Sequence, residues 1–247
     1  MARQRADVLV VDQGLAPTRS KARSLILAGV IIGKGDRRID KPGELLAADE
    51  ALRVKGETLP YVSRGGLKLA AAIAAFDIDV GDAVCLDVGA STGGFTDCLL
   101  QHGARRVYAV DVGYGQLAWS LRQDPRVVVI ERENIRHMPP ERVPEPCDCV
   151  VFDVSFISLQ KVVPAALRFV RPGATLVALV KPQFEVGRAD VGKGGIVRDE
   201  AARRRALHEV EAALAALGVE ALRSMESPVV GAKGNREWLL AGQVMVR

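Results

Sequence analysis

The chain has 247 residues, with 34 Lys or Arg against 30 Asp or Glu, and it is 49% hydrophobic and 26% charged. This balance is typical of one or two globular domains and excludes a disordered chain. No apolar run approaches the roughly 20 residues that span a bilayer. We therefore expect no membrane segment. We expect the four cysteines to be reduced thiols, which predicts a cytoplasmic protein.

The first 60 residues carry most of the excess positive charge, with 11 Lys or Arg against 8 Asp or Glu. We expect two short helices and two short strands there, at Ala6–Gln13, Thr18–Ala28, Val30–Gly33 and Ala51–Lys55. Basic side chains gather in this segment, which favours a phosphate-binding patch over a merely solvated helix face. The candidate contacts are Arg19, Lys21, Arg23 and Lys34.

After an expected linker at Gly56–Ser63, helices alternate with continuous apolar strands. This pattern predicts an α/β domain with a mostly parallel sheet covered on both faces. The last two strands have no helix between them, which predicts an antiparallel hairpin at one end. The expected strands are Ala83–Val88, Arg106–Asp111, Val127–Glu131, Cys149–Asp153, Thr175–Val180, Glu220–Met225 and Glu237–Ala241. The expected helices are Gly65–Phe76, Gly94–His102, Gln116–Arg122, Leu159–Phe169 and Glu200–Leu217.

A glycine-rich loop, Asp87–Phe95, lies where the first of these strands turns into a helix. Small residues let a ligand lie against the backbone, and the helix N-terminus offers free N–H groups. The glycines do not match the G-x-G-x-x-G fingerprint of NAD sites. The negative charge of an acid such as Asp87 would repel a pyrophosphate but would attract the positively charged S-adenosylmethionine. We therefore favour that cofactor over NAD, with Asp111 expected at its ribose hydroxyls.

Two later loops emerge at the same carboxyl edge, one with Asn134 and one with Asp153–Phe156. The second lacks the prolines of the D/N-P-P-Y/F motif that receives exocyclic amines, so base N-methylation is the weaker interpretation. Cys147 is a candidate nucleophile for methylation of a base carbon. We exclude it because we expect it before its strand, at the edge opposite the cofactor.

A hydroxyl acceptor needs a base and fixed charges that hold its oxygen in line with the methyl group. By topology, two lysines and two acids converge at the carboxyl edge. A second ammonium and a partly dry site favour the neutral form of a lysine, so we expect Lys181 to act as the base. Each of these residues alone would more often be a surface charge. The four are Lys68, Asp153, Lys181 and Glu237.

Five segments, Tyr61–Leu69, Asp87–Phe95, Asp111–Leu117, Asp153–Ser158 and Lys181–Gly187, resemble the TlyA (hemolysin A) family. The resemblance extends over nearly the whole chain. Members are ribosomal RNA cytidine 2′-O-methyltransferases. It implies an RNA-binding domain of the ribosomal-protein-S-four type at residues 1–59, an interdomain linker at 60–63 and a Rossmann-like, FtsJ-type methyltransferase domain at 64–247.

The resemblance also implies site residues. The family's Lys-Asp-Lys-Glu tetrad falls on the four residues that topology brings together. Phe156 matches a position expected to pack on the cofactor, and the segment Pro60–Arg64 matches an interdomain linker that affects cofactor binding. Arg64 is in addition one of our candidate RNA contacts. The candidate cofactor residues are Asp87, Gly89, Ala90, Ser91, Gly93, Gly94, Phe95, Asp111, Val112, Asn134 and Phe156.

Several alternatives remain open. Some family members extend further at the C-terminus than this sequence does, and the shorter form is associated with the large-subunit RNA alone. We therefore expect the large subunit as partner, with methylation of the small-subunit RNA as the alternative. A non-catalytic RNA-binding assembly factor is the rival function. Nothing in the composition supports a membrane-active hemolysin, and no metal is expected. The glycine-rich segment Gln183–Arg198 is either a mobile lid or an ordinary surface loop. The oligomeric state is not predicted.

Overall fold

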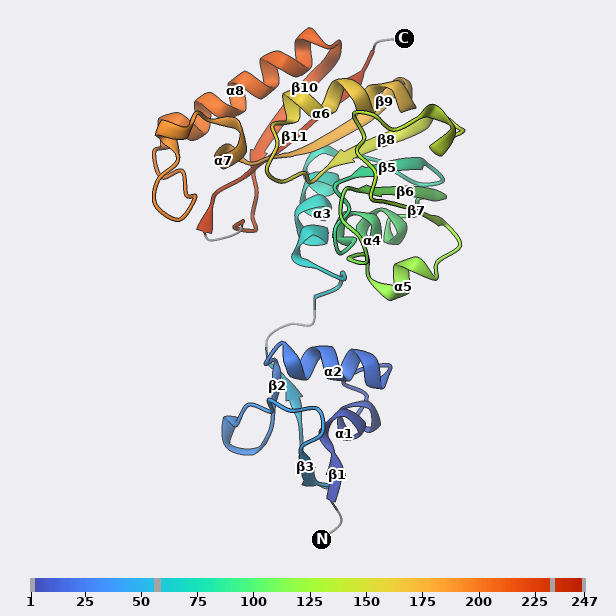
Figure 1. The fold of residues 1–247 in the computed structure, drawn as a ribbon, viewed down its shortest axis with the longest axis vertical. Coiled ribbons are helices and arrows are strands. Elements are labelled where there is room, and N and C mark those ends of the chain that lie inside the picture. Colours follow the sequence, from blue (N-terminus) through green and yellow to red (C-terminus); the bar gives the residue numbers. More distant parts are fainter. Residues whose placement is uncertain (1–2, 56–58, 232–233, 246–247) are drawn as a thin grey trace. The chain divides into compact units, whose positions relative to one another are not determined.

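The computed structural model describes residues 3–55, 59–231 and 234–245. The chain divides into two compact units, Met1–Leu59 and Pro60–Arg247 (Figure 1). No helix in the described part of the chain is long and apolar enough to cross a membrane.

The first unit combines two helices with two small antiparallel strand pairs. Its helices are α1 (Ala6–Asp12) and α2 (Arg19–Leu27), and a short 3-10 turn covers Lys34–Asp36. Thr18 caps α2, as expected, because its side chain accepts a hydrogen bond from the backbone N–H of Lys21 at 3.2 Å. Strand β1 (Arg3–Arg5) pairs with β3 (Leu45–Ala47), and β2 (Ile31–Ile32) pairs with β4 (Arg53–Val54).

The second unit is built on a seven-stranded sheet in the order β10-β11-β9-β8-β5-β6-β7. Strands β9, β8, β5, β6 and β7 are parallel to one another, while β11 is antiparallel to both β9 and β10. The predicted parallel sheet with an antiparallel end is therefore confirmed. The strands are β5 (Val84–Val88), β6 (Arg106–Asp111), β7 (Val127–Glu131), β8 (Cys147–Phe152), β9 (Val170–Val180), β10 (Val219–Glu226) and β11 (Trp238–Val244).

Helices cover both faces of this sheet (Figure 1). On one face, apolar side chains of α3 and α4 pack with the odd-numbered core residues of β5, such as Cys85; on the other, α6 and α8 pack with its even-numbered ones, such as Leu86. Strand alternation thus gives each layer its own core. The helices are α3 (Arg64–Phe76), α4 (Gly94–Gln101), α5 (Trp119–Arg122), α6 (Leu159–Ala166), α7 (Pro182–Glu185) and α8 (Glu200–Ala216), with 3-10 turns at Pro140–Arg142, Leu167–Phe169 and Arg188–Asp190.

Of the expected linker, residues 56–58 lie outside the described residues, and residues 60–63 pack against the second unit. The backbone N–H of Val62 donates to Asp97 at 2.8 Å, and the Gln101 amide donates to the Pro60 carbonyl at 2.9 Å. The Tyr61 ring covers Gly66, where a β-carbon would overlap the ring. Ser63 caps α3 by accepting from the N–H of Gly65. This segment is therefore the first packed part of the second unit.

Strand β8 begins two residues earlier than the sequence pattern indicates, because Cys147 pairs with Val170 of β9. The expectation that Cys147 precedes its strand is therefore wrong, because Cys147 is the first residue of β8. Cys147 remains at the amino end of β8, fully buried, and Asp153 follows the carboxyl end. The thiol and the acid are therefore at opposite edges of the sheet.

Candidate active site

The carboxyl edge of the sheet collects the charged residues of the second unit. Asp153 follows β8 and Lys181 follows β9, and both strands are parallel, so their ends meet at one edge. Strand β11 runs the other way and begins there, since its first residue, Trp238, pairs with Val180. Glu237 precedes this residue, and Lys68 reaches the same place from α3. Four residues distant in sequence thus converge.

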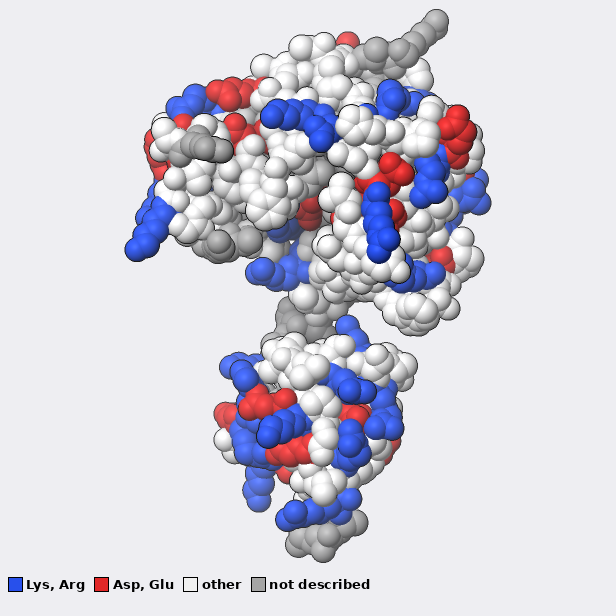
Figure 2. Space-filling view, in the orientation of Figure 1, with Lys and Arg blue, Asp and Glu red and all other residues white. Residues whose placement is uncertain are grey.

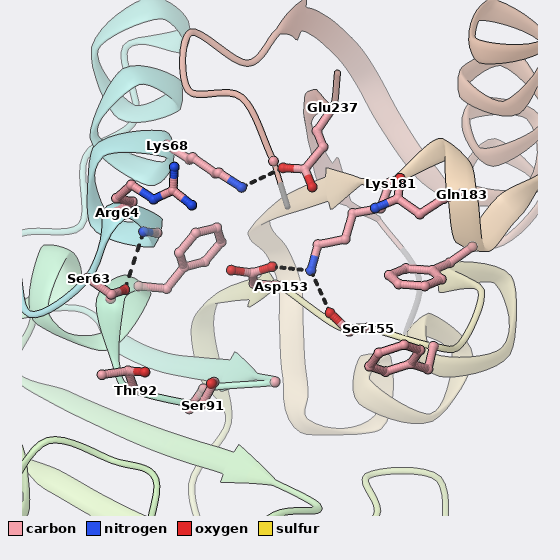
Figure 3. A pocket seen from close by; sticks show the side chains of 18 residues that line it. Ser63, Arg64, Lys68, Ser91, Thr92, Asp153, Ser155, Lys181, Gln183 and Glu237 are labelled. Atoms are coloured by element: carbon pink, nitrogen blue, oxygen red, sulfur yellow. Dashed lines mark hydrogen bonds and ion pairs between the residues drawn. The ribbon is translucent and has the colours of Figure 1, made fainter. Parts of the chain in front are cut away.

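These four side chains line a cavity of about 440 Å³, which we name the tetrad cavity (Figure 3). Arg64 and Ser63 enter it from the start of α3, and Gly89 to Thr92 enter it from the glycine-rich loop. Ser155, Phe156, Gln183 and Phe184 complete the side near β8 and β9. The volume is in the range of small-molecule sites.

The four charges form two ion pairs inside this cavity. The Lys68 Nζ is 2.5 Å from Glu237 Oε2, and the Lys181 Nζ is 2.6 Å from Asp153 Oδ1. Lys68 and Lys181 are each only 8% exposed and Glu237 is 2% exposed. Each buried ammonium is therefore matched by a carboxylate, which offsets the cost of removing the charges from water.

Lys181 has a second partner on the β8 loop. Its Nζ also donates to the Ser155 hydroxyl at 2.9 Å, so two side chains of this loop fix the end of the lysine (Figure 3). Gly231 lies directly against the Glu237 carboxylate, and a β-carbon at this position would overlap that carboxylate. Close neighbours therefore fix the side chains of both Lys181 and Glu237.

A second cavity of about 470 Å³, which we name the loop cavity, lies around the glycine-rich loop and the ends of β5 and β6. Asp111 at its wall accepts the N–H of Ser91 at 2.8 Å and that of Gly113 at 2.6 Å. A carboxylate has further lone pairs available after these two bonds, so Asp111 can still accept hydroxyl hydrogen bonds. Val112 and Asn134, two of the candidate cofactor residues, line the same cavity.

The two cavities share the backbone around Gly89. This glycine has φ of +88°, and a β-carbon would lie 2.8 Å from the carbonyl oxygen of Asp153. No larger residue fits between the two loops. Nine of the eleven candidate cofactor residues line one or both cavities; these are Gly89, Ala90, Ser91, Gly94, Phe95, Asp111, Val112, Asn134 and Phe156.

The remaining two, Asp87 and Gly93, do not line either cavity. Asp87 is the fourth residue of β5 and points toward α4, where its Oδ2 accepts from the Thr96 hydroxyl at 2.6 Å. Burial raises the pKa of this carboxyl to about 7, and its Oδ1 has no hydrogen-bond partner among the described residues. Gly93 has φ of +97° and is packed beneath Leu117 and Leu121, so its role is the turn into α4.

Phe156 occupies the boundary between the cavities. It lines both, it is 90% exposed, and its φ of +64° is uncommon for a bulky residue. Its ring centroid is 5.1 Å from that of Phe184 on α7. An exposed aromatic in a strained backbone conformation is a feature of ligand sites.

The candidate RNA contacts divide into two groups. Arg19 and Arg23 share a face of α2, but Arg19 also donates to the buried Asp7 at 3.0 Å. Lys21 and Lys34 are exposed. In Figure 2, acidic side chains lie among the basic ones over the first unit, where Arg38 pairs with Asp40. Arg64, in contrast, belongs to the tetrad cavity.

Several lining residues were not predicted individually. Ser155 and Phe184 lie inside the family-like segments Asp153–Ser158 and Lys181–Gly187. Because each is close in sequence to a tetrad residue, the sequence could have predicted that both line the cavity. Gly231 has no such signal, because only the fold brings its loop to Glu237.

Comparison with known proteins agrees with this geometry. The model of the FtsJ-like methyltransferase family matches residues 61–244. The chain is 47% identical over 239 residues to the 16S/23S rRNA (cytidine-2′-O)-methyltransferase TlyA of Mycobacterium tuberculosis, covering 96% of this chain and 89% of the relative. It is 42% identical over 236 residues to Hemolysin A of Brachyspira hyodysenteriae, covering 95% and 98%.

Solved structures show the same fold. A protein from Streptococcus thermophilus that carries a hemolysin name is 44% identical, with a TM-score of 0.74 over 99% of this chain and 90% of the other. The N-methyltransferase NodS of Bradyrhizobium japonicum, at 15% identity and a TM-score of 0.51, shares the fold over 73% of this chain and 85% of NodS. The chain is a methyltransferase that belongs to the FtsJ-like family and, within it, to the TlyA (hemolysin A) proteins.

Proposed function

We propose that this protein methylates the ribose 2′-hydroxyl of a cytidine in ribosomal RNA, with S-adenosylmethionine as the methyl donor. The observation that carries the proposal is the tetrad cavity, in which two lysines and two carboxylates meet beside the glycine-rich loop. Curated relatives from Mycobacterium tuberculosis and Campylobacter jejuni are named for this reaction, and both names include the 23S RNA. We therefore take the large-subunit RNA as the first substrate, which would place the protein in the cytoplasm.

The loop cavity suits the cofactor. The Asp111 carboxylate would accept the ribose hydroxyls, and Val112, Asn134 and Phe156 would border the adenine. The narrow approach at Gly89 would admit the methionine portion toward Asp153, whose negative charge favours a sulfonium. When bound, S-adenosylmethionine supplies an electrophilic methyl group and leaves as a neutral thioether.

The tetrad would prepare the acceptor hydroxyl. Lys181, oriented by Asp153 and Ser155, would in its neutral form take the proton from the 2′-oxygen as that oxygen bonds to the methyl carbon, and would release the proton to water afterwards. Lys68, held by Glu237, would donate a hydrogen bond to the same oxygen and fix its direction. In this scheme, the four tetrad residues are the only charged side chains that act on the acceptor oxygen.

The first unit would contribute binding. A small α+β unit with Arg19, Lys21, Arg23 and Lys34 exposed on it fits an RNA-contacting domain of the ribosomal-protein-S-four type. Several of its arginines are paired with acids, so the surface of this unit is not strongly basic. We therefore expect this unit to contribute moderate RNA affinity.

Transfer of labelled methyl from S-adenosylmethionine to purified large and small ribosomal subunits tests the proposal. The modified nucleoside is identified by mass spectrometry after complete digestion of the RNA. We expect 2′-O-methylcytidine from the large subunit. A base-methylated nucleoside would contradict the hydroxyl chemistry, and absence of transfer by protein shown to bind the cofactor would favour the assembly-factor function.

A further inference from the structure

Among the described residues, Arg64 is the one positively charged side chain of the tetrad cavity that has no acidic partner. Lys68 and Lys181 are each paired with a carboxylate, whereas Arg64 makes no hydrogen bond or ion pair with any described residue. Its side chain comes from the first residue of α3, one turn before Lys68, and is exposed at the cavity (Figure 3). The free guanidinium is therefore available to a ligand.

The charges of the lining do not cancel. Three cations, Arg64, Lys68 and Lys181, face two carboxylates, Asp153 and Glu237, and the other described residues of the lining are neutral. With both lysines protonated, the cavity thus carries one excess positive charge before any ligand enters, and Arg64 stays charged when Lys181 gives up its proton. A guanidinium binds carboxylate or phosphate oxygens through two parallel N–H donors, so its natural complement is an anionic oxygen pair.

We propose that Arg64 binds the phosphodiester group next to the ribose that is methylated. This inference rests on the proposed function. In RNA, the 2′-oxygen and the 3′-phosphate are attached to adjacent ribose carbons, so a ribose whose 2′-oxygen reaches Lys181 brings a phosphate to the same cavity. Arg64 would anchor that phosphate while the tetrad holds the hydroxyl.

The same chemistry has a second source, because S-adenosylmethionine carries a carboxylate. The glycine-rich loop, which would receive the cofactor, approaches the start of α3 at Gly94. We favour the phosphate because Arg64 is exposed, whereas Lys68, four residues on, is buried. Arg64 is therefore the cation that a large polymeric substrate could reach.

The test is the salt dependence of subunit binding by an Arg64→Gln variant of the full chain. We expect about tenfold weaker binding to the large subunit, the loss of one charge-assisted contact. The slope of log K against log salt should fall in magnitude by about 0.7 to 0.9. The dissociation constant for S-adenosylmethionine should stay unchanged, and in transfer assays KM for the subunit should rise more than kcat falls.

Arg171→Gln is the matched control. It removes the same charge from an exposed arginine that pairs with Asp148 at the opposite edge of the sheet, at 2.6 Å. Its salt slope should equal that of the unmodified chain, and Arg64→Lys should retain the slope because it retains the charge.

Three outcomes would overturn the assignment. Weaker cofactor binding with an unchanged RNA slope would mean that Arg64 binds the cofactor carboxylate. An unchanged slope and unchanged cofactor binding would mean that Arg64 has no anionic ligand. An equal loss in Arg171→Gln would reduce the effect to net charge. Failure of the unmodified chain to methylate ribosomal RNA would instead count against the proposed function, independently of these slopes.

Discussion

Within the described residues, each unit of the protein buries one aspartate completely, and the two carboxylates behave in opposite ways. Asp7 in the first unit accepts hydrogen bonds from Arg5 and Arg19, and the bond from Arg5 is the main reason that its pKa is lowered to about 2. Asp87 in the second unit accepts a side-chain hydrogen bond from the Thr96 hydroxyl, and burial raises its pKa to about 7. The first acid stabilises the fold when charged, and the second stabilises it when neutral.

Both units have arginine–acid pairs at the surface, such as Arg204 with Glu200 in the second unit, but only the second unit has enclosed lysine–carboxylate pairs among the described residues. In the first unit the pairs join exposed arginines to acids, as in Arg38 with Asp40, and such pairs contribute little to stability. In the second unit, two lysine–carboxylate pairs are enclosed in the tetrad cavity, where desolvation costs offset the attraction. The buried charge of the first unit therefore serves the fold, and we propose that the enclosed pairs of the second unit serve the methyl transfer.

The largest expected effect is the loss of methyl transfer when Lys181 is replaced by Ala. Removal of the proposed base should lower kcat by about 10²- to 10⁴-fold, while the cofactor dissociation constant changes little. Lys161→Ala, on the exposed face of α6, is the matched control and should be fully active. Loss of cofactor binding in Lys181→Ala would show that the lysine has a different role.

Asp87→Asn should stabilise the second unit, increasingly so as the pH rises. Between about pH 4 and pH 7 the unfolded chain loses the Asp87 proton while the folded chain keeps it, so the free energy of unfolding of the unmodified protein falls in this window. The advantage of Asp87→Asn should grow to at most about 4 kcal/mol by pH 7 and then level off.

The measurement is urea unfolding without cofactor at several pH values, followed by tryptophan fluorescence. Trp119 and Trp238 are the only two tryptophans and both lie in the second unit, so the signal is specific. Glu220→Gln, at an exposed site on β10, should show no such pH dependence. A pH-independent difference for Asp87→Asn would contradict the raised pKa.

Gly231→Ala should impair the tetrad without changing any of its residues. The added methyl group would overlap the Glu237 carboxylate and displace it from Lys68. We expect a fall in kcat of about 10- to 100-fold at unchanged cofactor affinity, because misplaced catalytic groups lose rate steeply. Gly187→Ala, which has open space around it, is the control. Full activity of Gly231→Ala would mean that the position of Glu237 is not critical.

The smallest expected effect concerns the first unit. Asp7→Asn should destabilise it by about 1–2 kcal/mol at neutral pH, a figure reduced for the exposure of the arginine partners. The difference should disappear as the pH falls from about 4 toward 2, where the native carboxylate is also protonated. Hydrogen exchange of residues 3–55 measures it, with the exposed Asp49→Asn as control. Faster exchange in both variants alike would contradict the role of Asp7.

Much of the second unit follows from the sequence. Continuous apolar strands separated by helices predict its sheet, and the rule that parallel strands end at one edge brings Asp153 and Lys181 together. The antiparallel final strand then adds Glu237. These are consequences of topology, so they need no knowledge of side-chain packing.

The details of pairing were not predictable in this way. Because side chains alternate along β5, Asp87 points toward α4, where it contacts Thr96, and it does not line either cavity. Its position near the end of the strand had suggested a place at the ligand site instead. Strands β1 and β3 are three residues long and too short to show a pattern. The partition of the tetrad into Lys68–Glu237 and Lys181–Asp153 depends on distances that only the folded chain sets.

The most direct test of the contrast between the units is to measure transfer rate and unfolding free energy on the same four variants, Lys68→Met, Asp153→Asn, Lys181→Met and Glu237→Gln. We expect methyl transfer to fall in all four by at least about tenfold. The double variant Lys181→Met with Asp153→Asn, which removes a whole pair, should be as stable as the unmodified protein or more so. A loss of stability in that double variant, in proportion to its loss of rate, would show that the charges of the tetrad cavity hold the fold together and would contradict their assignment to chemistry.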